Sequence, residues 1–96
     1  MDNLCGEHHY GNVTKVKIDQ ILNKLKETGA TISGNNPWDV NVQKHGIILR
    51  GTWVEASLSL SIIVTAKNWY VPCAKIWETI DPLINHISSL KDTEVR

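Results

Sequence analysis

The chain has 96 residues, of which 42% are hydrophobic and 21% are charged, as in an ordinary globular domain. Ten basic and ten acidic residues give a formal net charge of zero, which argues against nucleic acid and anionic lipid as partners. No apolar run approaches the ~20 residues of a membrane span, and the first residues lack the pattern of a signal peptide. We therefore expect one domain in the cytoplasm, without nucleic-acid or membrane partners.

Both ends of the chain are polar. Residues 1–12 are expected to form a flexible arm, residues 13–91 a single α+β domain, and residues 92–96 a C-terminal tail. The two cysteines, Cys5 and Cys73, are too few for a disulfide scaffold, and the sequence leaves a single bridge between them open. Reduced thiols are the default in the cytoplasm.

A first helix is predicted to begin near Thr14, whose side chain suits the N-cap position. Gly29 is expected to follow its last turn in a left-handed conformation. Residues 30–37, rich in turn-forming side chains, are interpreted as a connection anchored by Ile32. The buried stripe of the helix has the spacing i, i+3, i+4 and i+7, and consists of Ile18, Ile21, Leu22 and Leu25.

Three strands are predicted to follow, because apolar and polar residues alternate with a period of two. Their inward residues are Trp38, Val40 and Val42, then Ile47, Leu49 and Trp53, then Leu58, Leu60, Ile62 and Val64. Four-residue loops at 43–46 and 54–57 would join them. The first loop places Trp38 opposite Gly51, and the second places Gly51 opposite Leu60.

A second helix is predicted from Pro72 onward, since proline suits the first helical position. Pro82 lies opposite its apolar stripe, and there it either kinks the helix or breaks it, with Asp81 capping a new one. The stripe consists of Cys73, Ile76, Trp77, Ile80, Leu83, Ile84, Ile87 and Leu90. The expected fold is an α+β two-layer sandwich of α-β-β-β-α order: a three-stranded antiparallel meander with both helices on one face.

One hypothesis for the function is a small-ligand pocket formed by aromatic side chains on loops. Such side chains can stack on sugars, bases or apolar ligands, and nearby amide, carboxylate and imidazole groups can supply polar contacts. The ligand-binding candidates are Trp38, Trp69, Tyr70, Asn36, Asp39 and His45. The alternative for Trp38, together with Trp53 and Trp77, is that it fills a core that contains no Phe.

The leading hypothesis is a non-catalytic binding or interaction module that forms a homodimer through the outward face of its sheet. The second predicted loop places Ile48 opposite Ile63 on a face that is otherwise small and polar, and such a spot can pack against a second copy or a partner protein. The alternative is a solvated face. The interface candidates are Ile48, Ile63, Arg50, Thr52 and Ser61.

Catalytic chemistry has little support. Cys73 would lie in the first turn of a helix, where the macrodipole lowers the pKa of a thiol, but it also lies on the apolar stripe. Cys5 and His8, with His9 beside them, have a spacing that could supply two zinc ligands, without a second pair. A thiol- or metal-dependent enzyme is therefore the least favoured alternative, and we expect no catalytic residue, metal or cofactor.

Overall fold

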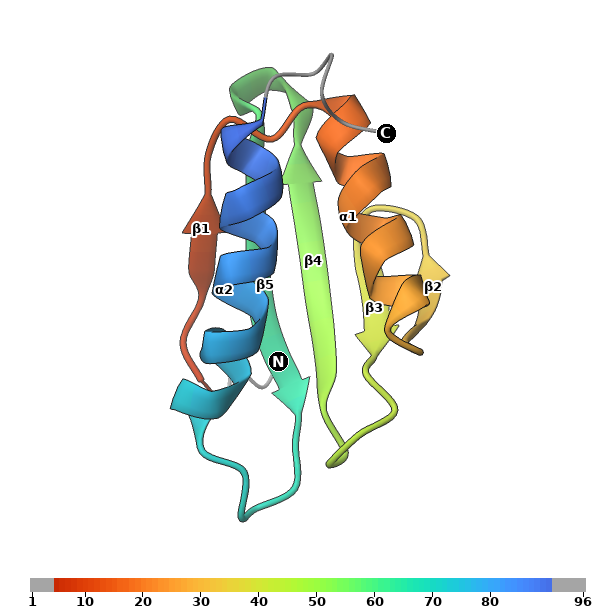
Figure 1. The fold of residues 1–96 in the computed structure, drawn as a ribbon, viewed down its shortest axis with the longest axis vertical. Coiled ribbons are helices and arrows are strands. Elements are labelled where there is room, and N and C mark those ends of the chain that lie inside the picture. The colour runs from red at the N-terminus through yellow and green to blue at the C-terminus, as the bar shows by residue number, and fades with distance from the viewer. Residues whose placement is uncertain (1–4, 91–96) are drawn as a thin grey trace.

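The computed structural model describes residues 5–90, and within this range it has two helices and one five-stranded antiparallel sheet. The helices, α1 and α2, lie on the same face of the sheet, α2 over β5 and β1 and α1 over β3 and β2 (Figure 1). The α+β class is confirmed, and the order is β-α-β-β-β-β-α. The strands are β1 (His8–Tyr10), β2 (Thr31–Gly34), β3 (Trp38–Asn41), β4 (Ile48–Val54) and β5 (Ser59–Ala66), and the helices are α1 (Lys15–Glu27) and α2 (Cys73–Ser89).

The sheet has five strands where the sequence predicts three. β2 comes from the segment interpreted as a connection, and it pairs with β3 at one edge, with Ile32 opposite Val40. Only Ile32 of this strand packs against the core, so β2 lacks the alternating pattern that marks a half-buried strand. The meander is therefore four-stranded. Its first strand, β2, could not be recognised in the sequence because most of its residues are exposed.

The fifth strand, β1, lies in the N-terminal arm. It pairs with β5 at the other edge of the sheet, with Tyr10 opposite Leu60, and Tyr10 is buried in the core. The prediction of a flexible arm therefore does not hold for residues 8–10. Residues 1–4 of that arm and the predicted tail at 92–96 lie outside the described residues.

The registers follow the predicted faces. Trp38 lies opposite Gly51, which confirms the first hairpin. In the second hairpin Gly51 lies opposite Ile62, two residues further along than predicted. The cause is Leu58, which adopts a left-handed conformation (φ 53°) after the 3-10 turn at Glu55–Ser57 and so belongs to the turn. Because the shift is even, the strand residues of this hairpin keep their predicted faces, and only Leu58 leaves the predicted inward set.

Both predicted stripes are confirmed except at Leu90, which follows α2 in an extended conformation, and α1 buries one residue more. Pro72 is the N-cap of α2, whereas the sequence predicts it as the first helical residue. Thr14 caps α1, accepting a hydrogen bond from the backbone N–H of Lys17, and α2 runs through Pro82 without a break. Lys17, which the helical pattern places on the polar side, is 2% exposed. Its amine donates to the carbonyl oxygens of Asn12 (3.2 Å) and Ser88 (2.8 Å), so a buried ammonium ties α1 to the last turn of α2.

Candidate functional site

Two loops meet at one end of the molecule, the lower end in Figure 1: the β3–β4 loop and the β5–α2 loop. The backbone N–H of Asn68 donates to the carbonyl of His45 at 2.9 Å. Gly46 permits this close approach, because its φ is +67° and a Cβ there would lie 2.5 Å from Oδ1 of Asn68. The Asn68 amide also donates to the hydroxyl of Tyr70 at 3.0 Å, and the Tyr70 ring meets the His45 ring edge-on.

Between these loops and α2 the structure leaves a cleft of about 490 Å³. Its volume lies in the range of roughly 300–1,000 Å³ that is typical of ligand sites. The loops contribute Val42, Lys44, His45, Ile47, Tyr70, Val71 and Pro72 to its lining. α2 contributes Lys75, Ile76, Thr79 and Ile80. Most of these side chains are apolar, so water in the cleft contacts a surface that would be more stable covered.

Two large aromatic side chains lie next to each other in the β5–α2 loop, and one of them, Tyr70, lines the cleft. Trp69 is 90% exposed and Tyr70 is 56% exposed, and their rings meet edge-on with centroids 5.9 Å apart. Tryptophan and tyrosine are the residues that most often dominate the energy of binding surfaces. Their exposure beside an apolar cleft marks this end of the molecule as a candidate binding site.

The polar groups that line the cleft are cationic or neutral. They belong to Lys44, Lys75, His45, Tyr70 and Thr79, and among the described residues no carboxylate belongs to the lining. Lys75 has an ion pair with Glu78, but its N···O distance is 3.9 Å and both side chains are about 70% exposed. Such a pair contributes little and is easily exchanged.

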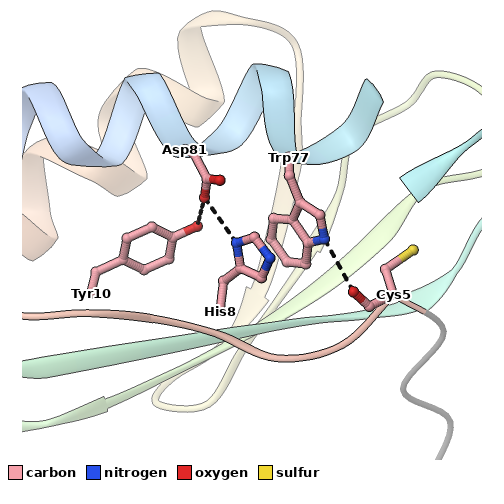
Figure 2. Close-up of polar contacts among 5 residues, drawn as sticks. All are labelled: Cys5, His8, Tyr10, Trp77 and Asp81. Atoms are coloured by element: carbon pink, nitrogen blue, oxygen red, sulfur yellow. Dashed lines mark hydrogen bonds and ion pairs between the residues drawn. The ribbon is translucent and has the colours of Figure 1, made fainter. Parts of the chain in front are cut away.

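The opposite flank of α2 is closed by the N-terminal segment, as Figure 2 shows. A disulfide joins Cys5 to Cys73 in the first turn of α2. One turn further along, the Trp77 indole donates to the Cys5 carbonyl at 3.2 Å, and the His8 ring stacks on Trp77 with centroids 3.6 Å apart. We call this set of contacts between residues 5–10 and α2 the clamp.

Asp81 completes the clamp from the next turn of α2 (Figure 2). One of its carboxylate oxygens lies 3.1 Å from Nδ1 of His8 and accepts a hydrogen bond from the Tyr10 hydroxyl. Burial, this hydrogen bond and the carboxylate charge raise the pKa of Tyr10 far above its ordinary range. The phenol therefore stays protonated, and the arrangement is one of satisfied partners that hold β1 in place.

The candidates for thiol and metal chemistry belong to the clamp. Cys5 and Cys73 are joined in a disulfide, so the expectation of reduced thiols is not met in this structure. His8 faces Asp81, and His9 turns to the other side, where it lies 3.0 Å from the Ser61 hydroxyl. In the part of the chain that the structure describes, no three His, Cys, Asp or Glu side chains group as metal ligands.

The structure divides the ligand candidates between the two ends of β4. His45 and Tyr70 line the cleft, where β4 begins, and Trp69 stands beside them. Asn36 lies near the other end, where its amide bonds to both backbone groups of Trp53 at 2.9 Å. Trp38 is half-buried against the core. A pocket that unites all of these residues does not form.

The interface candidates lie on the outward face of the sheet, as the predicted alternation requires. Their pairing differs: Ile63 lies opposite Arg50, and Ile48 lies opposite Ala66 beyond a register shift. Arg50 donates to Asp39, another ligand candidate, at 2.9 Å, and this contact raises the pKa of the guanidinium. The face therefore carries an ion pair where the sequence predicts two adjoining isoleucines.

Sequence reasoning missed the residues of α2 that line the cleft, Lys75, Ile76, Thr79 and Ile80. A signal for this end of the molecule was present in the predicted meander. Antiparallel strands reverse at each turn, so the loop after the first predicted strand and the exit of the third lie at the same end of the sheet. That reasoning brings His45 to Tyr70 and separates both from Asn36.

The chain matches no known protein family, and no curated protein and no solved structure is detectably similar to it. Within residues 5–90 no helix is long and apolar enough to span a bilayer. The argument for function therefore depends on the geometry of the cleft.

Proposed function

We propose that this chain is a non-catalytic binding module, and that its binding site is the cleft between the two loops and the first turns of α2. The observation that carries the proposal is an apolar cleft of about 490 Å³ whose lining residue Tyr70 contacts a 90% exposed Trp69 edge-on. Removing apolar surface from water would stabilise a complex by roughly 25 cal/mol per Å² covered, before the cost of association. A small molecule with an apolar body fits this site best.

The test uses Nile red, a neutral apolar dye whose emission shifts to the blue in an apolar site. We expect saturable binding to the full chain. Thr79→Trp would fill the cleft from α2 without disturbing the core, because Thr79 is exposed, and it should abolish binding. Glu78→Trp is the matched control, since Glu78 is an exposed neighbour outside the cleft lining. Equal binding by both variants would refute the site.

A second candidate function is self-association through the outward face of the sheet, as the sequence predicts. Two observations favour it: among the described residues neither helix covers this face, and it carries the partly exposed Ile48 and Ile63, with a half-exposed Val54 at the other end of β4. The Arg50–Asp39 ion pair near its centre argues for a weaker contact. Light scattering on Ile48→Lys tests the dimer, with Val16→Lys on the exposed side of α1 as the control. A monomer at millimolar concentration would end this candidate.

The location expected from the sequence, the cytoplasm, stays a prediction. The Cys5–Cys73 disulfide counts against it, because structural disulfides are rare in cytosolic proteins and common in oxidising compartments. Alkylation of thiols in the freshly isolated protein, before and after reduction, would distinguish the two locations. Free thiols before reduction favour the cytoplasm, and their absence favours an oxidising compartment.

A further inference from the structure

We infer that the ligand of the cleft is an apolar anion, with a carboxylate at the end of an apolar chain or ring. This inference rests on the proposed function and names the class of ligand. Its basis is that the lining of the cleft has an apolar part and a cationic part. The order of residues along the chain does not reveal this arrangement.

The cationic side chains of the cleft lie on two different walls. Lys44 belongs to the β3–β4 loop and Lys75 to the first turn of α2, and both line the same cavity. Among the described residues Lys44 has no ion pair, and the Glu78 partner of Lys75 is 3.9 Å away and largely exposed. A carboxylate in the cleft that reached either ammonium group would gain charge-assisted hydrogen bonds and displace at most one weak ion pair.

The start of α2 adds to this preference. Pro72 is its N-cap and lines the cleft, no side chain caps the helix there, and its first turn carries no acidic residue. The positive end of the helix dipole therefore points toward the side of the cleft where Lys75 lies. In a chain whose formal net charge is zero, this concentration of positive groups is local to the cleft.

Much of the lining favours an apolar body. Val42, Ile47, Val71, Ile76 and Ile80 line the cleft, and they offer no hydrogen-bonding side chain. An ion without an apolar body would leave this surface in water, and a polar body would lose its own hydration there. Together the two parts fit an amphiphilic monocarboxylate, whereas a neutral alcohol or an alkylammonium would match only the apolar part.

The test compares three probes with the same ten-carbon chain: decanoate, decan-1-ol and decylammonium. Binding is followed by backbone amide chemical shifts of the residues that line the cleft, with the total tryptophan emission, to which the exposed Trp69 contributes, as a second signal. We expect decanoate to bind about ten-fold more tightly than decan-1-ol, with decylammonium the weakest, and the preference to shrink as salt is added.

The variants separate charge from fold. Lys44→Gln and Lys75→Gln should each weaken decanoate binding about three-fold and leave decan-1-ol binding unchanged. Lys24→Gln, on an exposed position of α1, is the matched control and should change neither. If all three probes bind equally in the cleft, the inference is overturned and the proposed function stands. If none of them binds there, both are overturned.

Discussion

The two flanks of the first turns of α2 differ in what covers them. On one flank residues 5–10 form the clamp, with a disulfide, a stacked histidine and a shared carboxylate, and almost every polar group has a partner. On the other flank Ile76 and Ile80 border an open cleft, and among residues 5–90 its lysines have a weak ion-pair partner or none. The same helix therefore carries a stabilised side and an unfilled side, and the unfilled side is where a ligand can contribute free energy.

This comparison predicts where substitutions act. Changes in the clamp should lower the free energy of unfolding and leave the ligand site intact. Changes at the rim of the cleft should alter binding and leave the stability of the chain almost unchanged. A substitution that does both would show that the two flanks are not independent.

The largest effect is expected from the disulfide. Cys5 and Cys73 are 68 residues apart, and closing a loop of that length in the unfolded chain stabilises the fold by about 4 kcal/mol in the chain-entropy description. Urea unfolding of the Cys5→Ala/Cys73→Ala double variant should show this loss. Reduction of the wild-type chain should produce the same loss, and the double variant should not respond to reductant. Equal stability of oxidised and reduced wild type would break the account of the clamp.

Asp81 should have the next largest effect. Asp81→Ala leaves the buried Tyr10 hydroxyl and the His8 ring without their common acceptor, which should cost about 2 kcal/mol. Asp19→Ala removes an exposed carboxylate paired with Lys15 and serves as the control, with an expected loss below about 0.5 kcal/mol. Similar losses in the two variants, measured by urea unfolding, would mean that Asp81 does not hold β1.

The raised pKa of Tyr10 predicts a loss of stability at alkaline pH. Above the ordinary value of 10.0 the unfolded chain releases the phenolic proton, whereas the folded chain keeps it. Stability is therefore fully present below pH 10 and falls above it. From pH 10 to pH 11 the wild type should lose about 1 kcal/mol more than Tyr10→Phe. The free energy of unfolding is measured in urea at each pH. If it changed with pH in the same way in both proteins, the Tyr10 hydroxyl would not be buried and hydrogen-bonded as described.

The smallest effect on stability is expected at the rim of the cleft. Trp69 is 90% exposed, so Trp69→Ala should change the free energy of unfolding by less than about 0.5 kcal/mol. It should nevertheless weaken the binding of Nile red, because an aromatic contact at the edge of the cleft is lost. Thermal unfolding and the dye titration measure the two effects on one sample. A melting temperature several degrees lower in the variant would mean that Trp69 stabilises the fold and is not simply an exposed side chain beside the site.

The elements differ in how well the sequence predicts them. The first hairpin could be predicted, because alternation fixes the faces and the loop ending at Gly46 fixes the register. The predicted register of the second hairpin is wrong by two residues, because Leu58 is apolar and fits the strand pattern although its backbone is left-handed. β1 could not be predicted, because contacts with Asp81, more than 70 residues away in the chain, help to hold it.

The site was predictable only in part. Tyr70, Trp69 and His45 could be singled out as loop residues, and the structure brings them together. The lysines of the lining gave no signal, because an exposed lysine on a loop or helix is ordinary. What makes Lys44 and Lys75 a site is their position on two walls of one apolar cleft, and that depends on the packing of α2 against the sheet.

The central claim is that the cleft flank of α2 binds a ligand while the clamp flank does not. Titration of decan-1-ol into the isotopically labelled chain, followed by amide chemical shifts, tests it most directly. We predict saturable shifts at His45, Val71 and Ile76, with the amides of His8 and Tyr10 unmoved. Shifts centred on the clamp, or shifts spread evenly over the molecule without saturation, would contradict the claim.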